Sequence, residues 1–494
     1  MSHNENAPSY EELAALVVDL RRRLDAAEER AERAEARAVK AEARAAKAEA
    51  RVAELEARLR KDSSNSSKPS SIDQFKKPAK KRSLRRKSNR KPGGQAGHEG
   101  RTLQRVAVPD RVVDHFPAAC GVCEADLSDI DSLGFESRQM FDIPDPRTEV
   151  IEHRLHSLRC ECGNREKAQA PEGVVAPVQY GPKVSALAAY LYEVQFVAKE
   201  RVAETIEAVT GTRMSTATVE AMASRAAEKI SLSEFIERVR AYLAEGEVLF
   251  VDETGIRVAG TLAWLHSASN ETAAVFLAHP KRGKDAIAAM DILPHFTGVM
   301  HHDCWAPYDA YANIVAHQLC NAHALRELQA VCDAVHRDAD VGDDCWSCRV
   351  SASLKRIKRC VEAEPGEPMT GPWYLATHLA AWEKAVDQGV AETANRGSPL
   401  EKKANNLATR LRDRREDYLR FVTDERAEFS NNAAERQVRM AKVKMKVSGG
   451  FRSWDGADRF AVLRSYVHTA QKHGKTATQA LSSVFTPHIW QPAL

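Results

Sequence analysis

The sequence predicts a multidomain α+β protein organised around one α/β domain. The run V-L-F-V-D-E-T-G at 248–255 is apolar and then ends in acids and a glycine, which is typical of a buried strand with Asp252 at its end. The run G-V-M-H-H-D-C-W at 298–305 repeats this design 51 residues later with Asp303. Two strands that both end in an aspartate indicate one shared site.

A third acid belongs to a predicted helix much further along the chain. The segment N-N-A-A-E-R-Q-V-R at 431–439 has the pattern of a helix start, with Ser430 or Asn431 as N-cap and Glu435 in the first turns. Three carboxylates suit a pair of hard divalent cations, which prefer oxygen ligands and can act together on a phosphodiester. We therefore predict a site with two Mg²⁺ ions held by Asp252, Asp303 and Glu435. The alternative is that each acid is an ordinary surface or capping residue.

Length and composition limit the class of protein. The 494 residues allow two to four domains, and 43% hydrophobic with 29% charged residues is typical of a soluble protein. Because no apolar run approaches the roughly 20 residues of a membrane helix, and because the N-terminal residues lack a signal peptide's apolar stretch, we expect a cytoplasmic location and no membrane partner. Ten cysteines with C-x-x-C and C-x-C spacing favour metal binding over disulfides.

Residues 1–62 are predicted to form a coiled coil. Apolar residues recur in alternating steps of four and three without a break, which predicts one helix about 70 Å long and self-association into a homo-oligomer. The seam consists of Leu13, Val17, Leu20, Leu24, Ala27, Ala31, Ala34, Ala38, Ala41, Ala45, Ala48, Val52, Leu55 and Leu59. A solitary charged helix is the alternative.

Residues 63–105 are predicted to be a basic linker, rich in serine and glycine. Ten cations without an acid occupy 76–91, a density that favours contact with DNA phosphates over a merely solvated linker. The candidate DNA-binding residues are Lys80, Lys81, Arg82, Arg85, Arg86 and Lys87. The G-G-Q-A-G-H-E-G run at 93–100 is a predicted hinge.

A zinc-binding module is predicted at 106–172. Two close cysteine pairs form a tetrahedral thiolate set for a structural Zn²⁺, and reduced buried cysteines are the alternative. The pairs are Cys120 with Cys123 and Cys160 with Cys162, and the segment 147–154 between them is predicted to be a strand. A weaker candidate for a second zinc site is Cys345 with Cys348, joined by Cys332 or Cys360, for which simple core cysteines are the alternative.

The remaining chain is predicted from its periodicity. Residues 173–246 are predicted to be helical, and 201–222 has the outline of a helix-turn-helix, although an ordinary helical hairpin fits equally well. The order β-β-β-α-β with acids on the first and fourth strands predicts a ribonuclease-H-like domain. The boundaries are 247–330 for its first part, 331–424 for an all-α insertion, 425–480 for the second part with the third acid, and 481–494 for a tail.

Cations follow the third acid on the same predicted helix. Arg436, Arg439 and Lys442 recur at intervals of three, and Lys444 and Lys446 continue the charge. Cations beside an acidic metal site would suit the phosphate that is cut and the DNA strand next to it. The alternative is that they pair with nearby carboxylates.

Several motifs together resemble the insertion sequence 66 family of DDE transposases along nearly the whole chain. They are the N-terminal zipper, N-S-S-K-P-S-S from Asn65, G-G-Q-A-G-H from Gly93, the four cysteines, G-P at Gly181, D-E-T at Asp252, Asp303 with Tyr308, Cys320-x-x-His323-x-x-Arg326, and N-N-x-x-E-R ending at Arg436. The resemblance implies that Asp252, Asp303 and Glu435 are the catalytic triad, with His323 and Arg326 supporting it. The stretch after Glu435 departs from many members in lacking proline and asparagine.

The resemblance also implies an activity and partners. A DDE transposase cleaves double-stranded DNA at the terminal repeats of its element and joins the 3′-hydroxyl to target DNA, in some elements with small accessory proteins. Two other classes fit parts of the sequence. One is a metal-dependent nuclease or resolvase on the same fold. The other is a zinc-containing DNA-binding regulator without catalysis, which would leave the acids at the strand ends unexplained.

Overall fold

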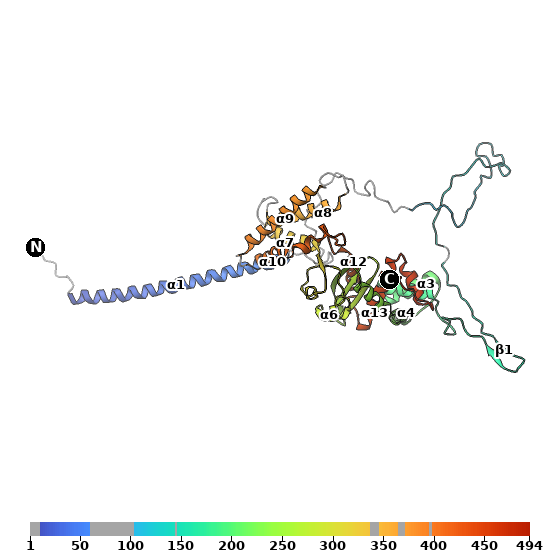
Figure 1. The fold of residues 1–494 in the computed structure, drawn as a ribbon, viewed down its shortest axis with the longest axis horizontal. Coiled ribbons are helices and arrows are strands. Elements are labelled where there is room, and N and C mark those ends of the chain that lie inside the picture. The colour runs from blue at the N-terminus through green and yellow to red at the C-terminus, as the bar shows by residue number, and fades with distance from the viewer. Residues whose placement is uncertain (1–9, 60–102, 144–145, 336–344, 364–370, 395–397) are drawn as a thin grey trace. The chain divides into compact units, whose positions relative to one another are not determined.

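We analysed a computed structural model of the chain (Figure 1). It describes residues 10–59, 103–143, 146–335, 345–363, 371–394 and 398–494. The chain divides into two compact units, of which the larger consists of Met1–Gln74, Ala170–Lys199 and Thr216–Leu494. The smaller consists of Phe75–Gln169 and Glu200–Ser215.

Helix α1 (Tyr10–Leu59) is one unbroken helix of 50 residues, as the sequence predicts (Figure 1). Seam side chains such as Leu20 and Leu24 are 52% and 58% exposed in the single chain. An apolar seam that stays in water is expected to find a partner, so self-association remains a prediction. The basic tract at 76–91 lies outside the described residues. Among the helices that are described, none combines the length and the apolar character that crossing a bilayer would require.

A five-stranded mixed sheet forms the centre of the larger unit. Its strand order is β5-β4-β3-β6-β7, with β3 to β5 forming an antiparallel meander and β6 and β7 running parallel to β3. The predicted β-β-β-α-β order is confirmed, and β7 is an additional strand. The elements are β3 (Val248–Val258), β4 (Thr261–Ser269), β5 (Ala274–His279), α6 (Lys284–Met290), β6 (Val299–His302) and β7 (Ala316–Leu319).

The parallel pairing of β3 with β6 begins with a backbone contact that only glycine permits. Val299 N donates to Glu247 O at 2.8 Å, and a Cβ built on Gly298 would lie 2.2 Å from that same oxygen. Backbone atoms cannot turn aside as a flexible side chain can. Gly298 therefore determines how closely β6 approaches β3 at the start of the ladder.

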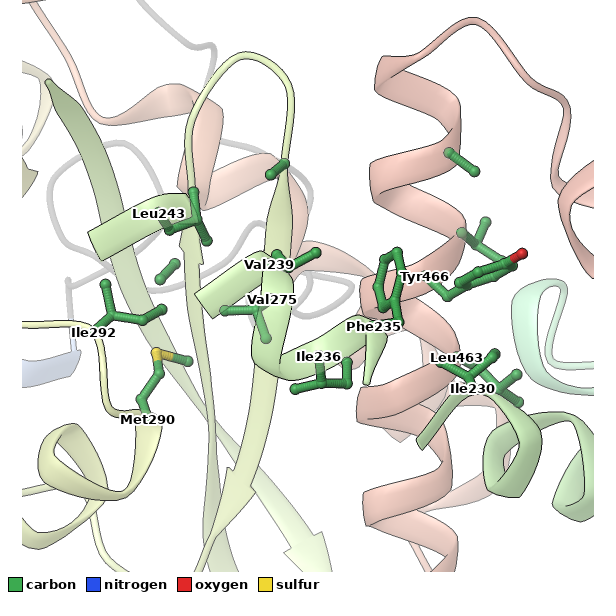
Figure 2. Packing of buried hydrophobic residues seen from close by; sticks show 14 of the residues in the cluster. Ile230, Phe235, Ile236, Val239, Leu243, Val275, Met290, Ile292, Leu463 and Tyr466 are labelled. Atoms are coloured by element: carbon green, nitrogen blue, oxygen red, sulfur yellow. The ribbon is translucent and has the colours of Figure 1, made fainter. Parts of the chain in front are cut away.

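Both faces of the sheet are buried. On one face, α4 (Thr216–Leu232), α5 (Phe235–Ala244) and α13 (Trp454–Lys472) pack over the meander, and Figure 2 shows Phe235 beside Tyr466 with Val275 from β5 nearby. The ring centroids of Phe235 and Tyr466 lie 4.9 Å apart. On the other face, α12 (Asn432–Ser448) covers β3 and β4, where Ile256 and Leu265 are buried. The sheet is thus the middle layer of three.

Helix α13 also covers the outer edge of the sheet. Ser465 Oγ accepts from Phe276 N at 2.9 Å, and Thr469 Oγ1 accepts from Ala274 N at 3.1 Å. Both hydroxyls therefore bond backbone groups of the edge strand β5 that have no strand partner on that side. Ser465 and Thr469 are one helical turn apart, so one face of α13 supplies both.

The segment before the sheet is helical, as expected. It contains α2 (Pro182–Ala189), the π-helical turn η2 (Tyr190–Val194), α3 (Lys199–Thr210), α4 and α5. Gly211 follows α3 with a φ of +72°, a left-handed conformation that favours glycine after a helix. The boundary between the two units falls at both ends of α3, so the helix-turn-helix stays a prediction.

Helices also fill the described part of 331–424, where no strand occurs. Figure 1 shows α8 and α9 lying side by side, and a separate apolar cluster joins these helices to β6 and β7. The helices are α7 (Asn321–Val335), α8 (Trp346–Glu362), α9 (Pro372–Thr393), α10 (Pro399–Asp413) and α11 (Arg415–Leu419), and after α13 the chain forms α14 (Ala477–Val484).

The predicted strand at 147–154 is wrong. Its apolar side chains are exposed, with Val150 at 91% and Ile151 at 66%, and no strand pairs with it among the described residues. β-branched residues favour a strand only where they can pack against neighbours on a pleated, half-buried surface. The strands of this unit are instead β1 (Ser157–Arg159) and β2 (Arg165–Lys167), a short hairpin that encloses the second cysteine pair.

Replacing Gly298 by alanine tests the close start of the parallel ladder. The new methyl group would push β6 away from Glu247 O, so we expect a loss of about 1–3 kcal/mol in the free energy of unfolding, the usual cost of overpacking. Gly283→Ala is the matched control, because a Cβ there meets no atom within 4 Å. Denaturant unfolding of both variants is the measurement. Equal stability of the two would refute the steric role of Gly298.

Candidate active site

The parallel pairing of β3 with β6 brings Asp252 and Asp303 beside each other. Asp303 directly follows β6, as predicted, but the prediction that β3 ends at Asp252 is wrong, because β3 continues to Val258 and Asp252 is paired with Ser267 of β4. The parallel register pairs Phe250 with His301, which places each aspartate two residues beyond a paired position. Both side chains are half-buried. Asp252 Oδ1 accepts from Glu253 N at 2.9 Å. The spacing of 51 residues seen in the sequence is therefore the spacing of this register.

Helix α12 brings the third acid to the same place. Three side chains along it are hydrogen-bonded to β3 and β4: Asn431 Nδ2 donates to Val251 O at 2.7 Å, Gln437 Nε2 to Ser269 Oγ at 2.8 Å, and Lys442 Nζ to Gly255 O at 3.1 Å. Asn431 is the N-cap residue of α12, but its amide reaches the strand. These bonds determine both the height and the rotation of the helix on the sheet, and they place Glu435 near the two aspartates.

The clustering of acids raises the pKa values of both aspartates. For Asp252 the main cause is burial, followed by the negative charges of Glu253 and Asp303 and, less strongly, Glu435, and its pKa lies well above the usual 3.8. Burial and the charge of Glu253 raise the pKa of Asp303 to about 6, while Arg282 acts in the opposite direction. Desolvated carboxylates that repel one another favour a cation as partner.

The oxygen ligands of this cluster fit magnesium. Asp252 and Asp303 would hold it directly, and Glu435 would complete the set from the helix. In the described residues, the oxygen atoms of Asp252, Asp303 and Glu435 do not all lie within 4.8 Å of one another. The reason is visible at Glu435, because its carboxylate contacts other partners.

Glu435 is held by the motif at the start of α7. Its Oε1 lies 3.2 Å from Arg326 Nη2, 3.3 Å from His323 Nδ1 and 3.9 Å from Cys320 Sγ. A spacing of three residues places these side chains on neighbouring turns of one helix face. The supporting residues suggested by the motif therefore do converge on the third acid, and Cys320 joins them.

Of these partners, Arg326 supplies the positive charge. Burial and, less strongly, the charge of the neighbouring Arg326 lower the pKa of His323 to about 4, so the imidazole is neutral at pH 7. Burial raises the pKa of Cys320 to about 11, so this residue is a thiol. Asn431 N donates to Cys320 Sγ at 3.3 Å, which links the start of α7 to the cap of α12.

Glu253, the neighbour of Asp252, has a different environment. Alternation along the strand directs it to the opposite face, where it is buried. Its Oε1 accepts from Arg282 Nη2 at 2.5 Å and Nε at 2.8 Å, and its Oε2 accepts from Tyr308 Oη at 2.5 Å. Asp309, an alternative to Asp303, pairs with Arg414 at 2.8 Å. Both acids therefore have partners that do not belong to the triad.

Arg282 is a site residue that the sequence analysis missed. Its guanidinium lies over the rings of Trp305 and Trp264, 4.2 Å and 4.9 Å from their centroids. Trp305 and Tyr308 belong to the loop that follows Asp303, so Glu253 and Arg282 attach that loop to β3. Tyr308 in the family motif was the one signal for this attachment.

The cations of α12 divide into exposed and buried groups. Arg436 and Arg439 are exposed and accessible to a polyanion. Lys442 is half-buried on Gly255 O, and burial lowers its pKa. Lys444 is buried, with its ammonium 5.3 Å from the Tyr192 ring centroid. Lys444 thus packs inside the protein and does not continue the charged face expected from the sequence.

The four cysteines of the smaller unit occupy two tight turns. Glu124 N donates to Cys120 O and Gly163 N to Cys160 O, both at 2.9 Å. Backbone N–H groups are the main cause that lowers the pKa of Cys120 and of Cys160, as a thiolate ligand requires. The two pairs do not form one cluster of ligand atoms within 4.8 Å in the described chain. Each turn suits zinc, which would have to draw the two together.

Comparison with known protein families agrees with these features. The description "Transposase IS66 family" matches residues 177–459, and "zinc-finger binding domain of transposase IS66" matches residues 117–163. A family of unknown function, DUF6444, matches residues 3–104. The comparison with curated proteins found no match.

The two transposase models identify the chain as a transposase with a zinc-finger domain, which belongs to a class of nucleic-acid-processing enzymes. More narrowly, the chain belongs to the IS66 family of transposases, because the family model covers more than half of it. The zinc-finger match includes all four predicted cysteines and supports a structural zinc.

The raised pKa of Asp303 predicts the pH dependence of stability in protein prepared without divalent cations. Its folded pKa of about 6 exceeds the usual 3.8, so the charged form is penalised above pH 6 and the penalty disappears as pH falls towards 4. The shift of about two units corresponds to at most about 3 kcal/mol. Asp303→Asn should therefore unfold at higher temperature than the wild type at pH 7.5, with the difference vanishing by pH 4.

Magnesium supplies the control for this prediction. If the carboxylate binds the cation, Mg²⁺ should raise the melting temperature of the wild type and should raise that of Asp303→Asn less. Asp309→Asn, which alters an acid paired with Arg414, should respond like the wild type. A variant at Asp303 with the stability profile of the wild type would show that this carboxylate is solvated.

Proposed function

We propose that the protein is a DDE transposase that cuts DNA at the ends of an insertion sequence and joins the 3′-hydroxyl to target DNA. Asp252, Asp303 and Glu435 are its catalytic acids. The observation that carries the proposal is the parallel register of β3 and β6, in which Asp252 within β3 is the neighbour of Asp303 directly after β6. Asp303 and Glu435 are among the charges that raise the pKa of Asp252. The strand order, with α12 across the sheet, supports a ribonuclease-H-like core.

Two Mg²⁺ ions held by the triad would supply Lewis-acid stabilisation of the attacking and leaving oxygens. Asp252 and Asp303 would hold these ions, and only through them could two carboxylates position a negatively charged phosphate. Glu435 can approach them only by sharing or releasing Arg326. In cleavage, a water oxygen forms a bond to phosphorus and the bond from phosphorus to the 3′-oxygen breaks. In joining, that 3′-oxygen forms the new bond to a target phosphate, whose own 3′-oxygen leaves.

The other parts of the chain would bind DNA and assemble the enzyme. Arg436 and Arg439 are exposed on α12 beside the triad and would contact the DNA strand that flanks the cut. The zinc-finger domain and the basic tract would bind the terminal repeats. Helix α1 would pair two chains, because joining two ends to one target needs two active sites held together.

Substitution of the triad tests the catalytic assignment. Asp252→Asn, Asp303→Asn and Glu435→Gln should each reduce cleavage and joining of a pre-cut end by on the order of 1,000-fold, the effect of losing several kcal/mol of metal stabilisation. Binding of end DNA, measured by fluorescence anisotropy, should change little, because the phosphate contacts lie elsewhere. Glu428→Gln and Asp309→Asn are matched controls that remove nearby acids outside the triad.

The outcome separates the three classes of function. A transposase joins ends, a resolvase cuts without joining, and a regulator does neither. Full activity in any one triad variant would remove that residue from the catalytic set. A wild-type protein that binds ends but neither cuts nor joins with Mg²⁺ present would favour the DNA-binding regulator.

Replacement of seam residues tests the assembly. Leu20→Lys, Leu24→Lys and Leu55→Lys together put charge into the seam, so the oligomer seen by light scattering should dissociate and concerted joining of two ends should be lost. Nicking of a short single end should persist. Val18→Lys with Val39→Lys is the matched control, since both valines are exposed on α1 outside the seam. Concerted joining at the wild-type rate by the seam variant would refute pairing through α1.

A further inference from the structure

Three cysteines of the larger unit converge outside the acidic site. Cys332 lies in the last turn of α7, Cys345 is the N-cap residue of α8, and Cys348 lies in its first turn. One sulfur atom from each lies within 4.8 Å of both others. The sequence left Cys332 and Cys360 as alternatives for a third thiol, and the packing of α7 against α8 brings Cys332 to the pair.

The exposure of these cysteines argues against a purely apolar role. All three are half-buried, whereas the neighbouring core positions Val350 and Leu354 have 0% exposure. Apolar packing would bury a small hydrophobic side chain such as cysteine. Cys360, on the same helix, does not belong to the cluster, so convergence is specific to the α7–α8 junction.

We propose that Cys332, Cys345 and Cys348 bind a zinc ion through their three sulfur atoms. Zn–S bonds of about 2.3 Å in a tetrahedral site place sulfurs roughly 3.8 Å apart. The observed separations, all within 4.8 Å, allow this with small side-chain movements.

The start of α8 favours the thiolates that zinc requires. Cys345 Sγ accepts from Cys348 N at 3.4 Å, and a helix N-terminus carries partial positive charge. The hydrogen bond from Cys332 is the largest cause that lowers the pKa of Cys345 to about 4, and the same bond raises the pKa of Cys332. Zinc binding would displace the remaining thiol protons.

The ion would be structural and would act on the helix that positions the third acid. Helix α7 carries His323 and Arg326, which contact Glu435, at its start and Cys332 at its end. A zinc ion bound by these cysteines would link the end of α7 to the start of α8. This site is independent of the catalytic proposal, because no acid of the triad takes part.

Zinc counting on the purified full-length chain tests the proposal. We expect two equivalents in the wild type, one in Cys345→Ser/Cys348→Ser, one in Cys120→Ser/Cys160→Ser, and none in the combined variant. Cys360→Ser is the matched control and should keep two, because it removes a thiol of α8 that lies outside the cluster. A single equivalent in the wild type, or two in Cys345→Ser/Cys348→Ser, would overturn the proposal.

Alkylation of the native wild type gives a readout that does not depend on how variants fold. Mass spectrometry should show Cys332, Cys345 and Cys348 protected from iodoacetamide until a chelator is added. Protection relieved only by a reductant would identify a disulfide between two of the thiols and refute the metal site. Modification at the rate of Cys360 without any chelator would refute it as well.

Discussion

The site depends on the parallel pairing of β3 with β6. Strands of a parallel ladder run in the same direction, so acids placed two residues beyond matched positions on β3 and β6 must be neighbours. Gly298 permits the ladder to begin close to Glu247, and every later residue inherits that register. Antiparallel pairing of the same two segments would have put the aspartates at opposite ends.

Bringing acids together in this way has an electrostatic cost, and the surrounding residues reduce it selectively. Glu253 is neutralised by Arg282, and Glu435 is paired with Arg326, but within the described part of the chain Asp252 and Asp303 form no such ion pair. The raised pKa values of these two aspartates reflect that difference. Their negative charge is therefore less compensated than that of Glu253 and Glu435, which favours a divalent cation beside them.

Much of the catalytic region could be predicted because its signals are local. The apolar runs that end at Asp252 and Asp303 identify β3 and β6, and the pattern at 431–439 identifies the start of α12. Strand β7, only four residues with polar ones among them, has no such signal. The attachment of Arg282 to Trp305, and the approach of Cys332 to Cys345, depend on packing between distant segments. Local periodicity contains no information about such contacts.

The predictions for 147–154 and for Lys444 were wrong, and part of the reason can be seen in the sequence. At 147–154 the β-branched residues Val150 and Ile151 are present, but no strand pairs with the segment among the described residues. On α12, Lys444 lies on the same helical face as Ala434, Gln437 and Ala441, all buried, so the 3.6-residue period places it against the sheet and not with Arg436 and Arg439. Charge alone suggested an exposed residue, and the aromatic rings around its ammonium explain how it is accommodated.

The hydroxyl groups of α13 have a consequence for how this protein can associate with itself. Sheets that end in a bare strand tend to recruit a strand from another molecule, which leads to open-ended stacking. Ser465 and Thr469 occupy backbone groups of β5 that such a strand would use. Growth by sheet extension is therefore blocked on this side by two side chains one helical turn apart. Self-association would then use elements such as the seam of α1, which pair a defined number of chains.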